Sequence, residues 1–227
     1  MRIKGIIAYF DGIDLAEGHY PGKILKQTEF GEYSPTPLGP LEACIKELHR
    51  EGAIPQSGMF FDAGSGDGRV AVLMGEMGYD AYGMEGDEEL ARKGYQNGNI
   101  LRELEVLRTD RPVIFGHGDF GDTKAYRMQL GIHVEEVGLF FNYQSNGDNL
   151  AKVIAAESPV GTKYLYLSNC PWAQYFAGAP ELTLRKTKRL NIGRDYKSMY
   201  LRLFEKKACQ QTPTHSQRHA HAPRAVV

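Results

Sequence analysis

Residues 60–70 read FFDAGSGDGRV, and this stretch decides the predicted fold. Two phenylalanines lead into Asp62, as at the end of a buried strand. Glycines then occupy every second position: Gly64, Gly66 and Gly68. Because glycine has no Cβ and tolerates a positive φ, a ligand can approach this backbone closely. A helical pattern follows the glycines, and a loop between a strand and a helix is where open α/β sheets bind their ligands.

Strand-like and helix-like segments alternate on both sides of this loop. The predicted strands are 59–64, 80–85, 112–119, 137–144 and 162–169. The predicted helices are 38–51, 68–77, 87–107, 123–130 and 149–157. Such alternation favours a parallel sheet with helices on both faces. Residues 182–190 and 198–206 alternate apolar and polar side chains and predict a closing antiparallel hairpin. The expected fold is a Rossmann-like, three-layer α/β sandwich.

The two ends of the chain differ from this pattern. IIAYF (6–10) is interpreted as a short strand, with ILKQTEF (24–30) as a candidate partner. YSPTPLGP (33–40) contains three prolines and predicts an extended arm that leads into a helix. We therefore divide the chain into an N-terminal extension (1–32), a main domain (33–206) and a polar, disordered tail (207–227).

Composition excludes several classes of protein. The 227 residues are 42% hydrophobic and carry a formal net charge of −1, so no global charge indicates a nucleic-acid or membrane partner. Three cysteines without a C-x-x-C pair indicate a reduced compartment, and we predict a cytoplasmic protein. No segment has the roughly 20 apolar residues of a membrane span. No metal site is predicted.

The glycine spacing argues against a dinucleotide. The dinucleotide fingerprint is G-x-G-x-x-G, whereas the third glycine here comes one residue early. Asp62 stands two residues before the first glycine. A carboxylate there would repel a pyrophosphate and would suit a ligand with an amine and a positive centre. A nicotinamide oxidoreductase is therefore disfavoured.

Acidic side chains also end the next two predicted strands. Glu85 can accept hydrogen bonds from both hydroxyls of a ribose. Asp119 can accept from the exocyclic amine of adenine, with Phe120 beside the ring. Each residue taken singly could be an exposed strand-end or turn residue, but with Asp62 they place polar groups at neighbouring strand ends. Asp87 is interpreted as a helix cap.

These motifs resemble those of class I, seven-stranded S-adenosylmethionine-dependent methyltransferases, over roughly residues 33–206. FDAGSGDGR is similar to the first motif of that family, Glu85 to the second and Asp119 to the third. The resemblance implies a sheet order of 3-2-1-4-5-7-6 and S-adenosyl-L-methionine as the cofactor. It implies these cofactor-binding residues: Tyr33, Thr36, Asp62, Gly64, Ser65, Gly66, Gly68, Glu85, Asp119 and Phe120.

The layout YSPTP, helix, DAGSGDGR is similar to that of small protein-lysine methyltransferases of archaeal and mitochondrial types. In that group the proline-containing arm lies over the cofactor, and this implies the roles of Tyr33 and Thr36. The fourth motif departs from the D/N-P-P-Y/F of many amino-directed enzymes, because Asn142 and Tyr143 are followed by Gln144. The departure argues against enzymes that methylate a flipped base. Asn142 and Tyr143 are the candidates for lining the acceptor pocket.

The main functional hypothesis is a methyltransferase that modifies lysine side chains of proteins. The alternatives are a methyltransferase acting on a small molecule or RNA, and a non-catalytic protein that binds the same cofactor. RKTKRLNIGRDYK (185–197) is basic and could steer an acidic partner, although a solvated hairpin with an edge protected by lysines explains it as well.

Overall fold

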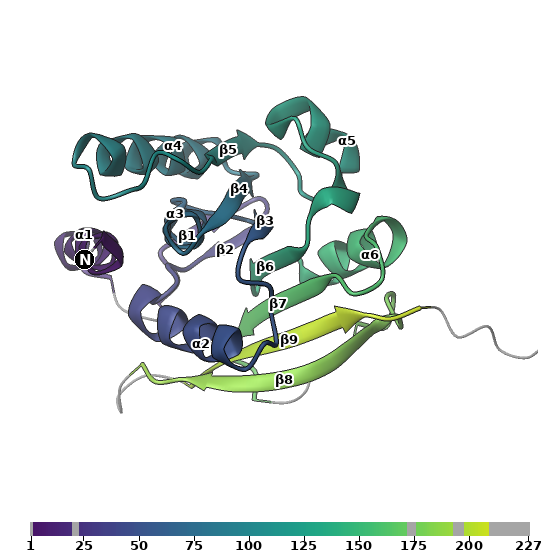
Figure 1. Cartoon of the computed structure of the whole chain (residues 1–227). Coiled ribbons are helices and arrows are strands. Elements are labelled where there is room, and N and C mark those ends of the chain that lie inside the picture. The colour runs from purple at the N-terminus through teal and green to yellow at the C-terminus, as the bar shows by residue number, and fades with distance from the viewer. Residues whose placement is uncertain (1, 20–22, 172–175, 193–197, 209–227) are drawn as a thin grey trace, which may run out of the picture.

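The computed structural model describes residues 2–19, 23–171, 176–192 and 198–208 (Figure 1). Its centre is a seven-stranded sheet with the order β5-β4-β3-β6-β7-β9-β8. The strands are β3 (Gly58–Ala63), β4 (Tyr79–Glu85), β5 (Val113–His117), β6 (Leu139–Tyr143), β7 (Lys163–Ser168), β8 (Leu182–Leu190) and β9 (Met199–Lys206). The first five are parallel, and β9 is antiparallel to both β7 and β8. The predicted fold class and strand order are confirmed.

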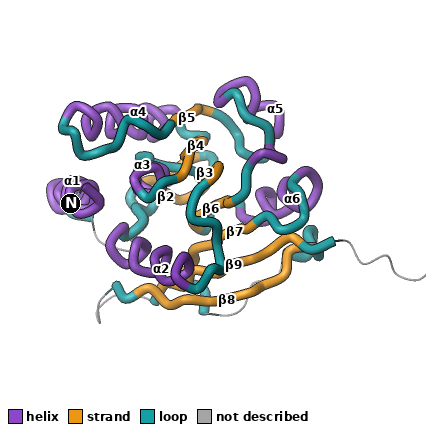
Figure 2. The backbone as a smooth tube through the Cα atoms, viewed as in Figure 1, coloured by secondary structure: helices purple, strands orange, loops and turns teal. Residues whose placement is uncertain are grey.

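Helices cover both faces of the sheet (Figure 2). They are α2 (Leu38–Arg50), α3 (Arg69–Glu76), α4 (Glu88–Glu103), α5 (Thr123–Ala125), which continues as a π-helix (Tyr126–Leu130), and α6 (Gly147–Glu157). A short 3-10 helix, Val134–Glu136, precedes β6. Neighbouring strand residues face opposite sides, so Phe60 joins the hydrophobic cluster under α2 and α3 and Phe61 joins the one under α6.

The predicted strand at residues 6–10 is wrong, because this segment belongs to helix α1 (Arg2–Ala16). Ile6 and Phe10 are four residues apart, share one face of the helix and are completely buried. They join the same hydrophobic cluster as α2 and α3. Burying two such side chains contributes about 1.5–3 kcal/mol each, which favours the helix over an isolated strand.

The segment at 24–30 does contain a strand, but its partner differs from the predicted one. β1 (Lys26–Thr28) pairs with β2 (Gly31–Tyr33) in a tight antiparallel hairpin. The hydroxyl of Thr28 accepts a hydrogen bond from the N–H of Phe30 and donates one to the carbonyl of Gly31. The turn is therefore fixed locally, and the hairpin leads directly into the arm.

Two further predictions bear on the ends of elements. β5 stops at His117, so Asp119 lies in the loop that follows. The predicted disordered tail, apart from residues 207 and 208, lies outside the described residues. In the described part of the chain, no helix combines the length and apolar character needed to cross a bilayer.

Candidate functional site

The glycine loop connects β3 to α3 and is fixed to the end of β4. The N–H groups of Gly64 and Ser65 both donate to the carbonyl of Met84, at 2.9 and 3.0 Å. All three glycines have positive φ, at 72°, 55° and 82°. The sequence therefore placed glycine where the backbone requires it.

Two of the glycines make room for the protein itself. A Cβ on Gly66 would lie 2.6 Å from the ring of Tyr33, and one on Gly68 would lie 2.7 Å from the ring of Phe115. A Cβ on Gly64 would meet only ordinary contacts, the nearest being Phe120 at 3.7 Å. The close approaches at Gly66 and Gly68 are therefore made by Tyr33 of the arm and Phe115 of β5, and Gly64 is the one of the three that leaves space beside its backbone.

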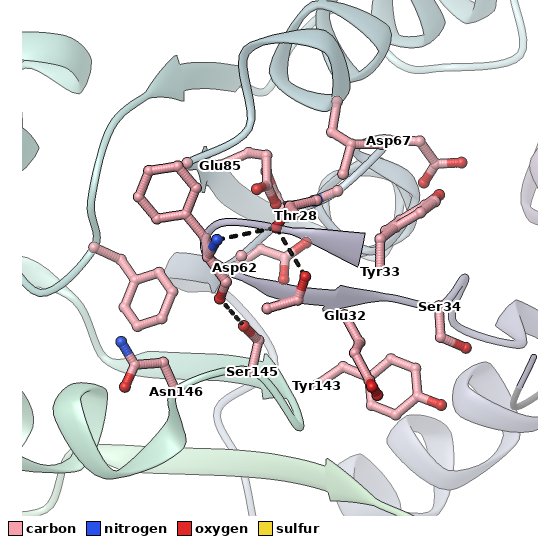
Figure 3. Close-up of a pocket in the computed structure, with 18 of the residues that line it drawn as sticks. Thr28, Glu32, Tyr33, Ser34, Asp62, Asp67, Glu85, Tyr143, Ser145 and Asn146 are labelled. Carbon is pink, nitrogen blue, oxygen red and sulfur yellow. Dashed lines mark hydrogen bonds between the residues drawn. The ribbon is translucent and has the colours of Figure 1, made fainter. Parts of the chain in front are cut away.

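A cavity, called here the main cavity, opens at the carboxyl ends of β3, β4 and β6 and the loop after β5, and the β1–β2 hairpin crosses it (Figure 3). It brings together most of the predicted cofactor-binding residues: Tyr33, Thr36, Asp62, Gly64, Ser65, Gly66, Glu85, Asp119 and Phe120. Gly68 is not among its lining residues, since Phe115 occupies the space beside it. The lining also includes Tyr143 but not Asn142.

Asp62 lines the main cavity and has an unsatisfied acceptor. Its side chain is buried, and its Oδ2 atom has no hydrogen-bond partner among the described residues. Burial raises the pKa of Asp62 well above its ordinary value, and the nearby charge of Glu85 adds to the effect. A buried carboxylate oxygen without a donor fits a positively charged amine of a ligand.

Glu85 ends β4 and is held by the backbone around it. Its two oxygens accept hydrogen bonds from the N–H of Gly66 at 2.8 Å and the N–H of Asp87 at 2.9 Å. Burial raises the pKa of Glu85, although these two N–H groups act in the opposite direction. Each oxygen keeps acceptor capacity for a further donor such as a ribose hydroxyl. Asp87 caps α4 through the N–H of Leu90, as predicted.

Asp119 and Phe120 form the wall on the side of β5. Asp119 is exposed and accepts a hydrogen bond from the N–H of Gly121 at 2.7 Å. Phe120 is buried, and its carbonyl accepts a hydrogen bond from the hydroxyl of Tyr126 at 3.0 Å. An exposed carboxylate beside a fixed aromatic ring can take the amine and the face of a planar base.

The hairpin supplies residues that the sequence analysis missed. The ring of Phe30 lies over Gly86, where a Cβ would be 2.6 Å from it. The carbonyl of Phe30 also accepts a hydrogen bond from the hydroxyl of Ser145 (Figure 3). Lys26 pairs with Asp87 at 2.8 Å and with Glu89 at 2.9 Å. In the sequence, the glycine directly after Glu85 is the signal that another group packs closely against the backbone at Gly86.

The two predicted acceptor-site residues have different surroundings. Asn142 is completely buried, and its Nδ2 donates to the carbonyl of Ala63 at 2.8 Å, so its side chain lies between β3 and β6. Tyr143 is half-buried and lines the main cavity. Burial raises the pKa of Tyr143, so its hydroxyl stays protonated at neutral pH. Asn142 contacts the loop framework, and Tyr143 contacts the cavity.

A second cavity, called here the side cavity, adjoins the main one. It is lined by Ile24, Phe30, Gly31, Glu32, Ser34, Tyr143, Gln144, Ser145, Asn146 and Asn169. Gln144 and Asn146 have positive φ, 58° and 51°, which is uncommon for residues other than glycine. Side-chain amides and hydroxyls make up much of these walls. The Nε2 of Gln144 donates a hydrogen bond to Oδ1 of Asn169 at 2.8 Å. The walls therefore offer neutral hydrogen-bonding groups together with the carboxylate of Glu32.

No family model and no curated protein matches the sequence. Solved structures do match. An RNA methyltransferase from Salinibacter ruber, in complex with S-adenosyl-L-homocysteine, is 16% identical with a TM-score of 0.50, covering 78% of this chain and 97% of that chain. The magnesium protoporphyrin IX methyltransferase ChlM from Synechocystis PCC 6803, with bound S-adenosylmethionine, is 12% identical with a TM-score of 0.53, covering 90% and 97%.

The rRNA methyltransferase aviRa from Streptomyces viridochromogenes is 13% identical with a TM-score of 0.54, covering 81% of this chain and 90% of that chain. At these identities the likeness shows a shared fold, the class I methyltransferase fold, over most of the chain. None of these three proteins is named as a protein-lysine methyltransferase.

Proposed function

We propose that this protein is an S-adenosylmethionine-dependent methyltransferase. The observation that carries the proposal is the buried, unsatisfied oxygen of Asp62 in the same cavity as the carboxylate of Glu85. The cofactor presents a protonated amine and two ribose hydroxyls, which match these two acceptors. The solved structures with the same fold, which contain the cofactor or its product, support this reading.

The proposed division of roles follows from position. Asp62 receives the amino group, Glu85 receives the ribose, and Asp119 with Phe120 receives the adenine. Tyr33, Thr36 and the loop residues Gly64, Ser65 and Gly66 contribute the remaining contacts, whereas Gly68 acts through packing against Phe115. When bound, the cofactor supplies a methyl group on a positively charged sulfur, which is a good leaving group because it departs as a neutral thioether when the acceptor takes the methyl group.

The protein itself has little covalent chemistry to perform. Its residues bind the two partners, exclude water and align the acceptor with the methyl carbon, and such positioning can lower a barrier by about 7–11 kcal/mol at most. Tyr143 lines both cavities and is therefore our candidate for orienting the acceptor. Asn142 holds the loop from behind through Ala63.

We propose a small molecule as the acceptor, entering through the side cavity. Its walls carry neutral amides, hydroxyls and the carboxylate of Glu32, and its lining residues include none of the cationic side chains that phosphate backbones require. The basic hairpin is largely neutralised, since Lys188 pairs with Glu47 and Glu51 and Arg185 pairs with Glu205. An electrostatic route for RNA is therefore weakened in the described part of this segment.

A protein lysine is the second candidate acceptor. It is favoured by one observation, the position of Tyr33 directly over Gly66, because an arm over the cofactor loop is what the motif resemblance implies. RNA is a third candidate acceptor, because two of the structural relatives are an RNA methyltransferase and an rRNA methyltransferase.

Calorimetry with S-adenosylmethionine and, separately, NAD tests the cofactor. Binding of the first alone supports the proposal, and binding of NAD alone overturns it. Incubation of the protein with labelled S-adenosylmethionine and separated small-molecule, RNA and protein fractions of a cell extract then tests the acceptor. Label in the small-molecule fraction is expected; label confined to protein or to RNA selects the second or third acceptor. Tight binding without any transfer indicates a non-catalytic binder.

A further inference from the structure

Arg69, the first residue of α3, joins three segments that are far apart in the sequence. Its Nε and Nη2 atoms donate to the carboxylate of Asp67 in the glycine loop, at 2.9 and 2.7 Å. Its Nη1 and Nη2 atoms donate to the carboxylate of Asp14 in α1, at 2.9 and 2.8 Å. Its Nη1 also reaches the carbonyl of Thr36 in the arm at 3.4 Å.

This cluster lies in the interior, where a missing partner has a large effect. Arg69 is 3% exposed, and the side chain of Asp67 is 6% exposed. Burial acts against the charge of Arg69, but the carboxylates of Asp67 and Asp14 outweigh it and raise the pKa of the guanidinium. Without Asp14, the Nη1 group would keep only its long contact to Thr36, and a buried charged donor would lose its main acceptor.

Helix α1 is held in place independently of Asp14. Ile6 and Phe10 are completely buried, and the guanidinium of Arg69 lies over the ring of Phe10, 5.0 Å from its centroid. The hydroxyl of Tyr9 donates to Oδ1 of Asn97, whose Nδ2 donates to the backbone carbonyl of Asp67, both at 2.9 Å. The helix therefore reaches the glycine loop by two routes.

We propose that Asp14 is a positioning residue for the cofactor site. Asp14 is not among the lining residues of the main cavity, whereas Thr36, Asp67 and Arg69 are. By holding Arg69, it supports the glycine loop through Asp67 and the arm through the carbonyl of Thr36. The N-terminal helix α1 then contributes to cofactor binding without contacting the cofactor. This inference rests on the proposed function, because the ligand whose affinity it governs is S-adenosylmethionine.

Calorimetric titration of the full chain with S-adenosylmethionine tests the inference. Asp14→Asn keeps the size of the side chain and removes its charge, and we expect its Kd to rise by about tenfold or more. Asp14→Glu, which restores the carboxylate, should recover part of the affinity. Lys4→Gln is the matched control: it also removes one charge from α1, and Lys4 is exposed and makes no hydrogen bond to Arg69 in the described part of the chain.

Thermal unfolding without ligand, followed for the same variants, separates positioning from folding. We expect Asp14→Asn to unfold as a single cooperative transition and to lose affinity, with recovery in Asp14→Glu. An Asp14→Asn protein that binds S-adenosylmethionine as tightly as the wild type overturns this inference alone. A wild-type protein that does not bind the cofactor overturns the proposed function and this inference with it.

Discussion

The backbone N–H of Gly66 donates a hydrogen bond to Oε2 of Glu85 at 2.8 Å. These residues are 19 positions apart, and the bond joins the glycine loop after β3 to the end of β4. The carboxylate is thus fixed from two sides, because the N–H of Asp87 donates to its other oxygen. The same group that we assign to the ribose also holds the glycine loop that lines the main cavity.

Glu85→Gln should weaken binding of S-adenosylmethionine by about 10- to 100-fold, because the two ribose hydroxyls would lose the charged acceptor of their hydrogen bonds. The amide NH2 of the variant would also face one of the backbone N–H groups. Calorimetry measures the change. Asp80→Asn is the control, because Asp80 lies in the same strand but pairs with Arg111. Equal affinity of Glu85→Gln and wild type would refute the ribose assignment.

Affinity for the cofactor should depend on pH through Asp62. Burial and the charge of Glu85 raise its pKa in the free protein, whereas a bound ammonium group would lower it. Between the ordinary pKa of about 3.9 and the raised value, binding then releases a proton, and affinity increases with pH by up to about tenfold per unit. Above the raised pKa the affinity is constant.

The stability of the folded protein should change with pH in the opposite direction to the cofactor affinity. A raised folded-state pKa means that protonated Asp62 contributes stability at low pH, and this contribution is lost as the pH rises through the raised pKa. Asp62→Asn should remove both dependences. Calorimetry in buffers of different ionisation enthalpy counts the released protons. Detection of no proton release by the wild type would contradict a raised pKa of Asp62 that falls on binding.

Gly66→Ala should disturb the arm as well as the loop. The new Cβ would lie 2.6 Å from the ring of Tyr33 at a φ of +55°, so it meets both steric overlap and left-handed strain. The strain alone costs about 1–2 kcal/mol. Gly161→Ala is the control, because Gly161 has a φ of +94° but no atom within 4 Å of the added Cβ.

We therefore expect both alanine variants to lower the free energy of unfolding, and only Gly66→Ala to lower cofactor affinity. Chemical denaturation and calorimetry provide the two measurements. Adding Tyr33→Leu to Gly66→Ala should relieve part of the overlap. If Gly161→Ala reduced affinity to the same extent, the contact between the arm and the loop would have no role in binding.

Tyr143→Phe should separate acceptor turnover from cofactor binding. The change removes one hydroxyl from a side chain that lines both cavities, with its ring left in place. Affinity for S-adenosylmethionine should stay within about twofold, while methyl transfer to the acceptor falls by about tenfold, the effect of one lost hydrogen bond. Tyr82→Phe is the control, because Tyr82 belongs to the hydrophobic cluster under α6, whereas Tyr143 packs against the cluster under α2 and α3. A parallel loss of affinity and turnover would contradict the assignment.

Several elements follow from local pattern alone. β8 has the predicted bounds. Its apolar and polar residues alternate, so a strand in only one register can bury the apolar side chains and expose the polar ones. Helix α1 was missed because a short apolar run such as IIAYF fits a strand or a buried helix equally well, and only the burial of Ile6 and Phe10 against the core distinguishes them.

The candidate site divides in the same way. Asp62 and Glu85 were found because each lies at or next to the end of a strand and within two residues of a glycine, a pattern that is visible in the sequence. The location of Asn142 was not visible. Because Ala63 and Asn142 are register partners, its amide bonds across to β3 and leaves Tyr143 to line the cavity.

The sequence by itself determined the alternation of strands and helices, the glycine loop and the carboxylates at the strand ends, since each depends on residues close together in the chain. The tertiary structure decided what covers the loop. Phe30 over Gly86, Tyr33 over Gly66 and Asp14 against Arg69 join segments up to 56 positions apart. Such contacts are selected by the packing of the whole fold, and no local spacing predicts them.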